Sequence, residues 1–331
     1  MYNTKHARIF EITCLPRFPL EQRAQGKLFF CSMPKVPYEK IALTFEEQLE
    51  QLSGRGLFVD NRDKALHLLS TLSYYRLSGY WYPFLEDKTN HKFKPGTTFD
   101  QAFRIYCFDR ELKKLVSSQI EKIEVALRSA MIYHLSHENG PFWYTNSNLF
   151  LDVIIHARFL ISLQDHVHKS KEEFIKAFKK KYIEPLPPAW MGMELISLGS
   201  LSILYSNLKP GRSKRSVANF FSISDGVFES WLHAITFVRN TCAHHARLWN
   251  KVMNIQPLIP NTTALPWLTN NAVSNNKLYY FLSIVLYLQQ SISPTSTFLL
   301  RFKDLLISYP EIEVKAMGFP EDWETEALWS S

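Results

Sequence analysis

Cysteine is scarce in this sequence, and the cysteines that it has are not paired. The 331 residues contain four, at no recurring spacing: Cys14, Cys31, Cys107 and Cys242. A disulfide framework and a zinc site of four thiolates both depend on paired spacing, so neither is expected. We therefore predict a reducing compartment and a cytoplasmic protein.

Long apolar runs and a secretion signal are lacking as well. The longest apolar run, near Leu278 to Leu288, is too short to span a bilayer. The chain does not open with a basic segment followed by an apolar one, so we expect no secretory signal. The sequence thus predicts no membrane partner.

The common phosphate-binding and hydrolase signatures are also missing. We find no G-x-G-x-x-G, no Walker lysine loop, no G-x-S-x-G and no internal repeat. We accordingly predict no cofactor. What the chain does have is a 46% apolar composition, typical of a folded protein, and a net charge of +7. That charge mildly favours a polyanionic partner.

The apolar residues follow helical periods, and no segment alternates convincingly with period two. Capping boxes predict helices that start at Thr44, Thr98 and Ser170, and the second helix continues to about His137. We expect Asp60 to cap another helix. Further predicted helices are 152–167, a buried helix over 190–208, one from about Val227, 276–291 and 296–308. The predicted fold class is all-α.

One short segment concentrates the polar chemistry of the chain. Phe237–Asn250 holds Arg239, Asn240, His244, His245 and Arg247. On a continuous helix, Asn240, His244 and Arg247 share one face, and the long side chain of Arg239 reaches the same patch. A guanidinium is a fork for phosphate oxygens, and an imidazole moves protons near neutral pH. This combination suits a phosphodiester.

Three interpretations of that segment compete. In the first, the arginines and histidines only cap and solvate the end of a helix. In the second, Cys242, His244 and His245 bind a metal, but adjacent histidines point to different sides of a helix and no further ligand pair has suitable spacing. We therefore predict no metal site. The third interpretation is metal-independent RNA cleavage.

RNA cleavage assigns a role to each polar residue. His244 moves a proton at the attacking 2′-hydroxyl or at the leaving oxygen, and Arg239 neutralises the phosphorane. Asn240 orients the imidazole or the phosphate, and His245 is the alternative to His244. One imidazole does not comfortably serve as both base and acid, so we predict a two-fold homodimer that supplies a second set.

Basic and aromatic residues elsewhere are candidates for RNA binding. They lie in the aromatic segment 74–84, in the long predicted helix, at the basic end of the helix after Ser170 and in the basic turn 209–215. The candidates are Arg76, Tyr80, Arg110, Arg128, Lys179, Lys180, Arg212, Lys214, Arg215 and Arg247. The alternatives are a packed aromatic corner broken by Gly79 and Pro83, and charges on solvated helix faces or paired with Asp109, Glu121 or Glu124.

The segment Arg239–Asn250 resembles the signature of the Abi-like (abortive infection, AbiD/AbiF-type) family of the HEPN superfamily. That superfamily is marked by an arginine, a polar residue and a histidine after a gap of four to six, and Arg239 and His244 match with a gap of four. Further blocks resemble the family in the same order: 43–49, 74–84, 108–112, 123–128, 186–190 and 315–323.

The resemblance implies an α-helical HEPN-type bundle with additional N- and C-terminal helices. It implies an Abi-like domain over 37–260 and a helical extension over 261–331 packed on it. Residues 1–32 lack a helical period and have no counterpart in the family, so we interpret them as an atypical extension with Met33 as an alternative start; the other interpretation is a true N-terminal arm. The resemblance also implies phage defence by abortive infection, action on RNA as a ribonuclease, and binding of a small structured non-coding RNA. Because some HEPN proteins bind RNA without cutting it, a non-catalytic RNA-binding module is the alternative.

Overall fold

The computed structural model describes residues 37–270 and 272–330. The chain divides after Leu43, and residues 37–43 have no regular secondary structure. The predicted extension 1–32 and the alternative start at Met33 lie outside the described residues. Everything below concerns the unit that begins at Thr44.

The all-α prediction is confirmed. The α-helices of the described residues are α1 (Phe45–Gly54), α2 (Arg62–Leu72), α3 (Tyr74–Trp81), α4 (Phe99–Asn139), α5 (Val153–Lys169), α6 (Glu173–Lys181), α7 (Ala189–Gly192), α8 (Leu198–Ser206), α9 (Arg212–Phe220), α10 (Asp225–Ala243), α11 (Leu278–Ile292), α12 (Phe298–Ser308) and α13 (Ala327–Ser330). The strands β1 (Leu85–Asp87) and β2 (Lys92–Phe93) form one antiparallel pair. Strands this short carry no alternating pattern, which is why the sequence did not predict them.

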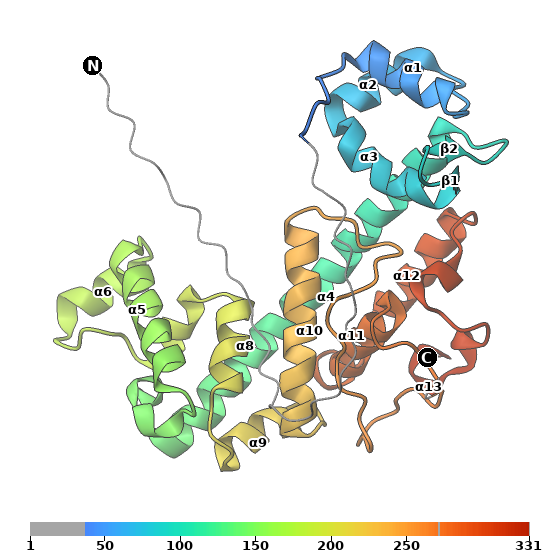
Figure 1. Cartoon of the computed structure of the whole chain (residues 1–331). Helices are drawn as coiled ribbons and strands as arrows, with labels where there is room; N and C mark the ends of the chain where they lie inside the picture. The colour runs from blue at the N-terminus through green and yellow to red at the C-terminus, as the bar shows by residue number, and fades with distance from the viewer. Residues whose placement is uncertain (1–36, 271, 331) are drawn as a thin grey trace, which may run out of the picture. The chain divides into compact units, whose positions relative to one another are not determined.

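Helix α4 is the element around which the others pack. Its capping box is formed as predicted: the Thr98 hydroxyl accepts from the Gln101 N–H at 3.2 Å, and the Gln101 side chain accepts from the Thr98 N–H at 3.0 Å. The helix ends at Gly140, whose φ of +80° suits glycine. Helices α3, α9, α10, α11 and α12 all contact it (Figure 1).

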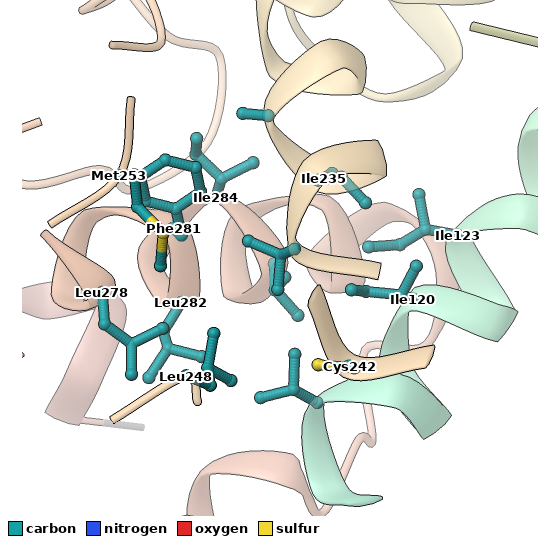
Figure 2. Close-up of a cluster of buried hydrophobic side chains, with 14 of the residues drawn as sticks. Ile120, Ile123, Ile235, Cys242, Leu248, Met253, Leu278, Phe281, Leu282 and Ile284 are labelled. Carbon is teal, nitrogen blue, oxygen red and sulfur yellow. The ribbon is translucent and has the colours of Figure 1, made fainter. Parts of the chain in front are cut away.

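The centre of the core lies where α4, α10 and α11 meet. Figure 2 shows Ile120 and Ile123 of α4 facing Ile235 of α10, with Phe281 and Ile284 of α11 in the same cluster. All five side chains are buried. Burial of a large apolar side chain contributes about 1.5–3 kcal/mol, so this contact stabilises the arrangement of the three helices.

Two of the predicted helix starts are wrong in detail. Asn61, not Asp60, caps α2, because the Asn61 side chain accepts from the Lys64 N–H at 2.9 Å. Helix α6 begins at Glu173 without a capping box, since the Ser170 hydroxyl accepts from the Glu172 N–H instead. By contrast, Asp152 caps α5 as predicted.

Three predicted boundaries are corrected by packing. Helix α3 continues through Gly79, because its buried residues on either side hold the helix against α4, and only Pro83 ends the helical geometry, in a 3₁₀ turn over Tyr82–Phe84. The single helix predicted over 190–208 is divided into α7, a 3₁₀ turn over Met193–Leu195 and α8, with Ile196 extended between them. The predicted basic turn 209–215 instead enters α9 at Arg212.

The C-terminal helices α11 and α12 form close to the predicted ranges and pack on α4. Within the described part of the chain, none of the helices combines the length and the apolar character that crossing a membrane requires.

Candidate active site

Helix α10 positions the polar segment as the sequence predicts. Its residues Phe228, Trp231, Leu232, Ile235 and Val238 are buried, which fixes how the helix is rotated against the core. Near its end the Arg239 guanidinium donates to the Asn240 side-chain oxygen at 3.1 Å. This contact brings the two predicted phosphate-binding residues together.

The helix ends between Ala243 and His245. The His245 N–H donates to the Cys242 carbonyl and the Ala246 N–H donates to the Thr241 carbonyl, both at 3.0 Å, which is the Schellman pattern. His245 takes the left-handed position usually given to glycine, with φ of +54°. The chain therefore reverses at His245.

This reversal corrects one prediction. Asn240 and His244 remain on the helix and its C-cap, but Arg247 lies beyond the end of α10. The three residues therefore do not share one helical face. His245 is a tolerated left-handed residue rather than a glycine, so the sequence carries no clear signal for the end of the helix here.

A buried carboxylate holds the chain that follows the turn. Asp109 of α4 has no exposed surface, and its Oδ1 accepts the N–H groups of Leu248 at 3.0 Å and Trp249 at 2.6 Å. Its Oδ2 accepts the Tyr80 hydroxyl at 2.7 Å. Burial, together with the Asp109 charge, raises the pKa of Tyr80, so this hydroxyl stays protonated and donates.

The partner of Asp109 is Lys113, one helical turn further along α4. The Lys113 Nζ lies 2.9 Å from the Asp109 carboxylate and also donates to the Ala246 carbonyl at 3.2 Å. The sequence offered Asp109, Glu121 and Glu124 as alternative partners of Arg110 and Arg128, and for Arg110 this is wrong because it pairs with Glu111. A spacing of four between Asp109 and Lys113 was the signal that could have revealed the pair.

Helix α3 holds the other side of the turn. The Arg76 guanidinium donates to the His245 carbonyl at 2.6 Å, and the Arg247 guanidinium donates to the Gly79 carbonyl. Arg76 and Arg247 therefore join α3 to the segment that carries the histidines, although they are far apart in the sequence.

Two clefts meet at this turn. The larger, of about 820 Å³, is lined mainly by α4 and α10, with Thr71 and Leu72 of α2 and Arg76 of α3. The smaller, of about 340 Å³, is lined by α3 and the turn itself. The charged and histidine residues of the larger cleft are Arg76, Arg110, Lys113, Lys114, Glu121, Glu124, Arg239 and His245. Arg76, His244, His245 and Arg247 belong to the smaller one. Arg76 and His245 line both clefts.

A family model described as Abi-like protein matches residues 67–250, which is more than half of the chain. The chain belongs to the Abi-like protein family. Membership suggests a role in abortive infection, a form of phage defence. A search of curated proteins and a search of solved structures each found no match. Both clefts and Asp109 lie inside the matched range of this Abi-like protein.

Two of the predicted RNA-binding residues of the Abi-like chain have structural roles instead. Tyr80 is 2% exposed and packs edge-on against Tyr106, so its ring has no free face for a base. The side chain of Arg128 is 11% exposed, and it donates to the carbonyls of Met193 and Ile196 and pairs with Glu124. Both predictions are corrected, because the two side chains are buried and already bonded to other groups of the protein.

The basic candidates on α6 and α9 lie outside the two clefts. Lys179 donates to the Val167 carbonyl at 2.7 Å, and Lys180 beside it is exposed on α6. On α9, Arg212 and Arg215 are exposed, whereas Lys214 is buried. The Lys214 ammonium contacts Glu229 at 3.0 Å and two backbone carbonyls, so its predicted contact with RNA is corrected.

Cations and imidazoles outnumber the two carboxylates, Glu121 and Glu124, in the described clefts. Within residues 37–270 and 272–330 there is no group of three or more His, Cys, Asp or Glu side chains that could hold a metal ion. Cys242, the thiol considered as a ligand, lines the larger cleft and is buried, which raises its pKa to about 11. At neutral pH this thiol is protonated.

Proposed function

We propose that this Abi-like protein is a metal-independent endoribonuclease of the HEPN type that acts in abortive infection. The observation that carries the proposal is the composition of the larger cleft. Arg239 and His245 line this cleft together with Arg76, Arg110, Lys113 and Lys114. Guanidinium groups suit phosphate oxygens, and an imidazole suits proton transfer near neutral pH. Two acidic residues on the wall, Glu121 and Glu124, moderate the positive charge.

The proposed reaction is an internal transesterification. An imidazole takes the proton of a ribose 2′-hydroxyl, the 2′-oxygen forms a bond to the adjacent phosphorus, and the bond from phosphorus to the 5′-oxygen breaks. The leaving 5′-oxygen receives a proton from a second imidazole. Arg239 pairs with the non-bridging oxygens, where negative charge develops. The products are a 2′,3′-cyclic phosphate and a 5′-hydroxyl end.

The reaction uses two imidazoles, one as base and one as acid. His244 and His245 are the candidates, since both line the smaller cleft and His245 also lines the larger one. A homodimer that joins two such sites remains part of the proposal. Cleavage whose rate per chain rises with protein concentration, in step with a rise in solution mass, supports the dimer. A monomeric mass at full activity contradicts it.

The test compares histidine variants of the full chain on added RNA in the presence of a metal chelator. His244→Asn and His245→Asn remove an imidazole, and asparagine also tolerates the left-handed backbone at position 245. Loss of a general acid or base costs about 10²–10⁴-fold in rate. We expect at least one of the two variants to lose that much while RNA binding is retained.

The matched control is His233→Asn, an exposed histidine on the same helix. It should cleave RNA at the wild-type rate. Wild-type protein that binds RNA and leaves it intact would favour the non-catalytic RNA-binding module. Sequencing of the RNA that copurifies with the protein tests for a small structured partner RNA.

A further inference from the structure

We infer that α3 carries a binding site for an unpaired nucleobase, with the ring of Tyr75 as its stacking platform. The inference rests on the proposed function and specifies its substrate class: RNA whose nucleotide beside the reacting phosphate is single-stranded. The observations are the position, the exposure and the surroundings of this one ring.

Most aromatic residues of α3 are used in packing. Tyr74 lies 5.7 Å from Trp81 between ring centroids and accepts a hydrogen bond from Arg55, and Tyr80 bonds to Asp109. Tyr75 differs, since it is 89% exposed. Among the described residues, none makes a ring contact or a side-chain hydrogen bond with it. Packing therefore does not explain an aromatic side chain at this position.

The exposed ring stands on the rim of the smaller cleft. Tyr75 lines that cleft together with His244 and His245, and its neighbour Arg76 reaches into both clefts. The Arg76 guanidinium donates to the His245 carbonyl at 2.6 Å, which ties this cation of α3 to the backbone of the turn that carries the two histidines. A phosphate bound by Arg76 would have its adjoining base within the same small cleft as Tyr75.

Such a site selects single-stranded RNA. Bases in an A-form duplex are stacked on one another and paired, and the deep major groove keeps side chains from them. An unpaired base can turn outward and lie on an aromatic ring, and this contact tolerates any base because each has a π-face. The cations around Arg76 bind the phosphate backbone of both duplex and single-stranded RNA. The Tyr75 ring is therefore the group that distinguishes single-stranded RNA from the duplex.

The experiment measures binding to two probes of one sequence, a single strand and its blunt duplex. The protein is the full chain carrying both His244→Asn and His245→Asn, so that neither imidazole supports cleavage during the binding measurement. We expect Tyr75→Ala to weaken binding of the single strand about 5- to 150-fold, and Tyr75→Trp to restore it. Duplex binding should not change. The control is Tyr82→Ala, which removes a half-exposed tyrosine that lines neither cleft.

The outcomes separate this inference from the proposed function. Equal losses on both probes, or no loss with Tyr75→Ala, overturn the base platform while cleavage by the wild-type chain stands. A wild-type chain that neither binds nor cuts either probe overturns the proposed function and the platform with it. A loss confined to the single strand supports the platform.

Discussion

Asp109 is a buried carboxylate that needs several hydrogen-bond and ion-pair partners around it. Its carboxylate has no exposed surface, accepts from Tyr80, Leu248 and Trp249, and forms an ion pair with the buried Lys113. A buried charge is tolerable only when paired and fully hydrogen-bonded. The segment after the histidines is therefore held by two side chains of α4, Asp109 and Lys113.

We expect Asp109→Asn to lower the free energy of unfolding by about 3–5 kcal/mol, because Lys113 would remain buried without a counter-charge. Urea denaturation measures the change. The matched control on the same helix is Glu111→Gln, which breaks exposed pairs with Arg110 and Lys114 and should cost no more than about 1 kcal/mol. If both variants unfold alike, Asp109 does not have the role assigned to it.

At the scale of elements, the basic residues of α9 differ in burial and in their partners. Lys214 bonds to the Ser206 and Leu208 carbonyls and to Glu229, and so joins α9 to the end of α8 and to α10. One position later, Arg215 is exposed. One cation of this helix is therefore buried in the fold, whereas its arginines are exposed to solvent.

We expect Lys214→Ala to destabilise the fold by about 1–3 kcal/mol, because the two carbonyls and Glu229 would lose their donor. Thermal denaturation would show the loss, and Arg215→Ala should leave the midpoint unchanged. The opposite ranking, with Arg215 as the more destabilising site, would contradict the packing described for α9.

At the scale of the molecule, the clefts are assembled from segments that are distant in sequence: 71–80, 106–124 and 239–247. These segments are brought together by α4 and by the core it shares with α10 and α11. Many of the titratable groups in that interior are phenols and thiols. Burial raises the pKa of Tyr205 and Tyr280, and it raises the pKa of Cys242 to about 11.

These raised pKa values predict a loss of stability in alkali. The unfolded chain releases the Cys242 proton near pH 9 while the folded chain keeps it to about pH 11, so the contribution is complete below pH 9 and is lost as pH rises through 11. At about 1.4 kcal/mol per pKa unit, Cys242 accounts for about 2–3 kcal/mol, and the buried tyrosines act in the same direction.

Denaturation curves from pH 7 to pH 11 measure this dependence. Cys242→Ala should show a shallower decline over the upper part of that range, from a lower starting stability. A wild-type stability that stays level to pH 11 would contradict the burial of these groups.

The sequence by itself determined the all-α class, most of the longer helices, the buried side of α10 and the segment that resembles the family, and it predicted Arg239, His244 and His245 as site residues. Those features are local, because helical period, caps and residue type are written in neighbouring positions. Only the tertiary structure decided that Tyr75 is exposed while Tyr80 is buried, that Asp109 accepts from Leu248 and Trp249, and that Arg76 donates to the His245 carbonyl. Each of these depends on which helix packs against which, since burial and these hydrogen bonds involve residues of other segments of the chain.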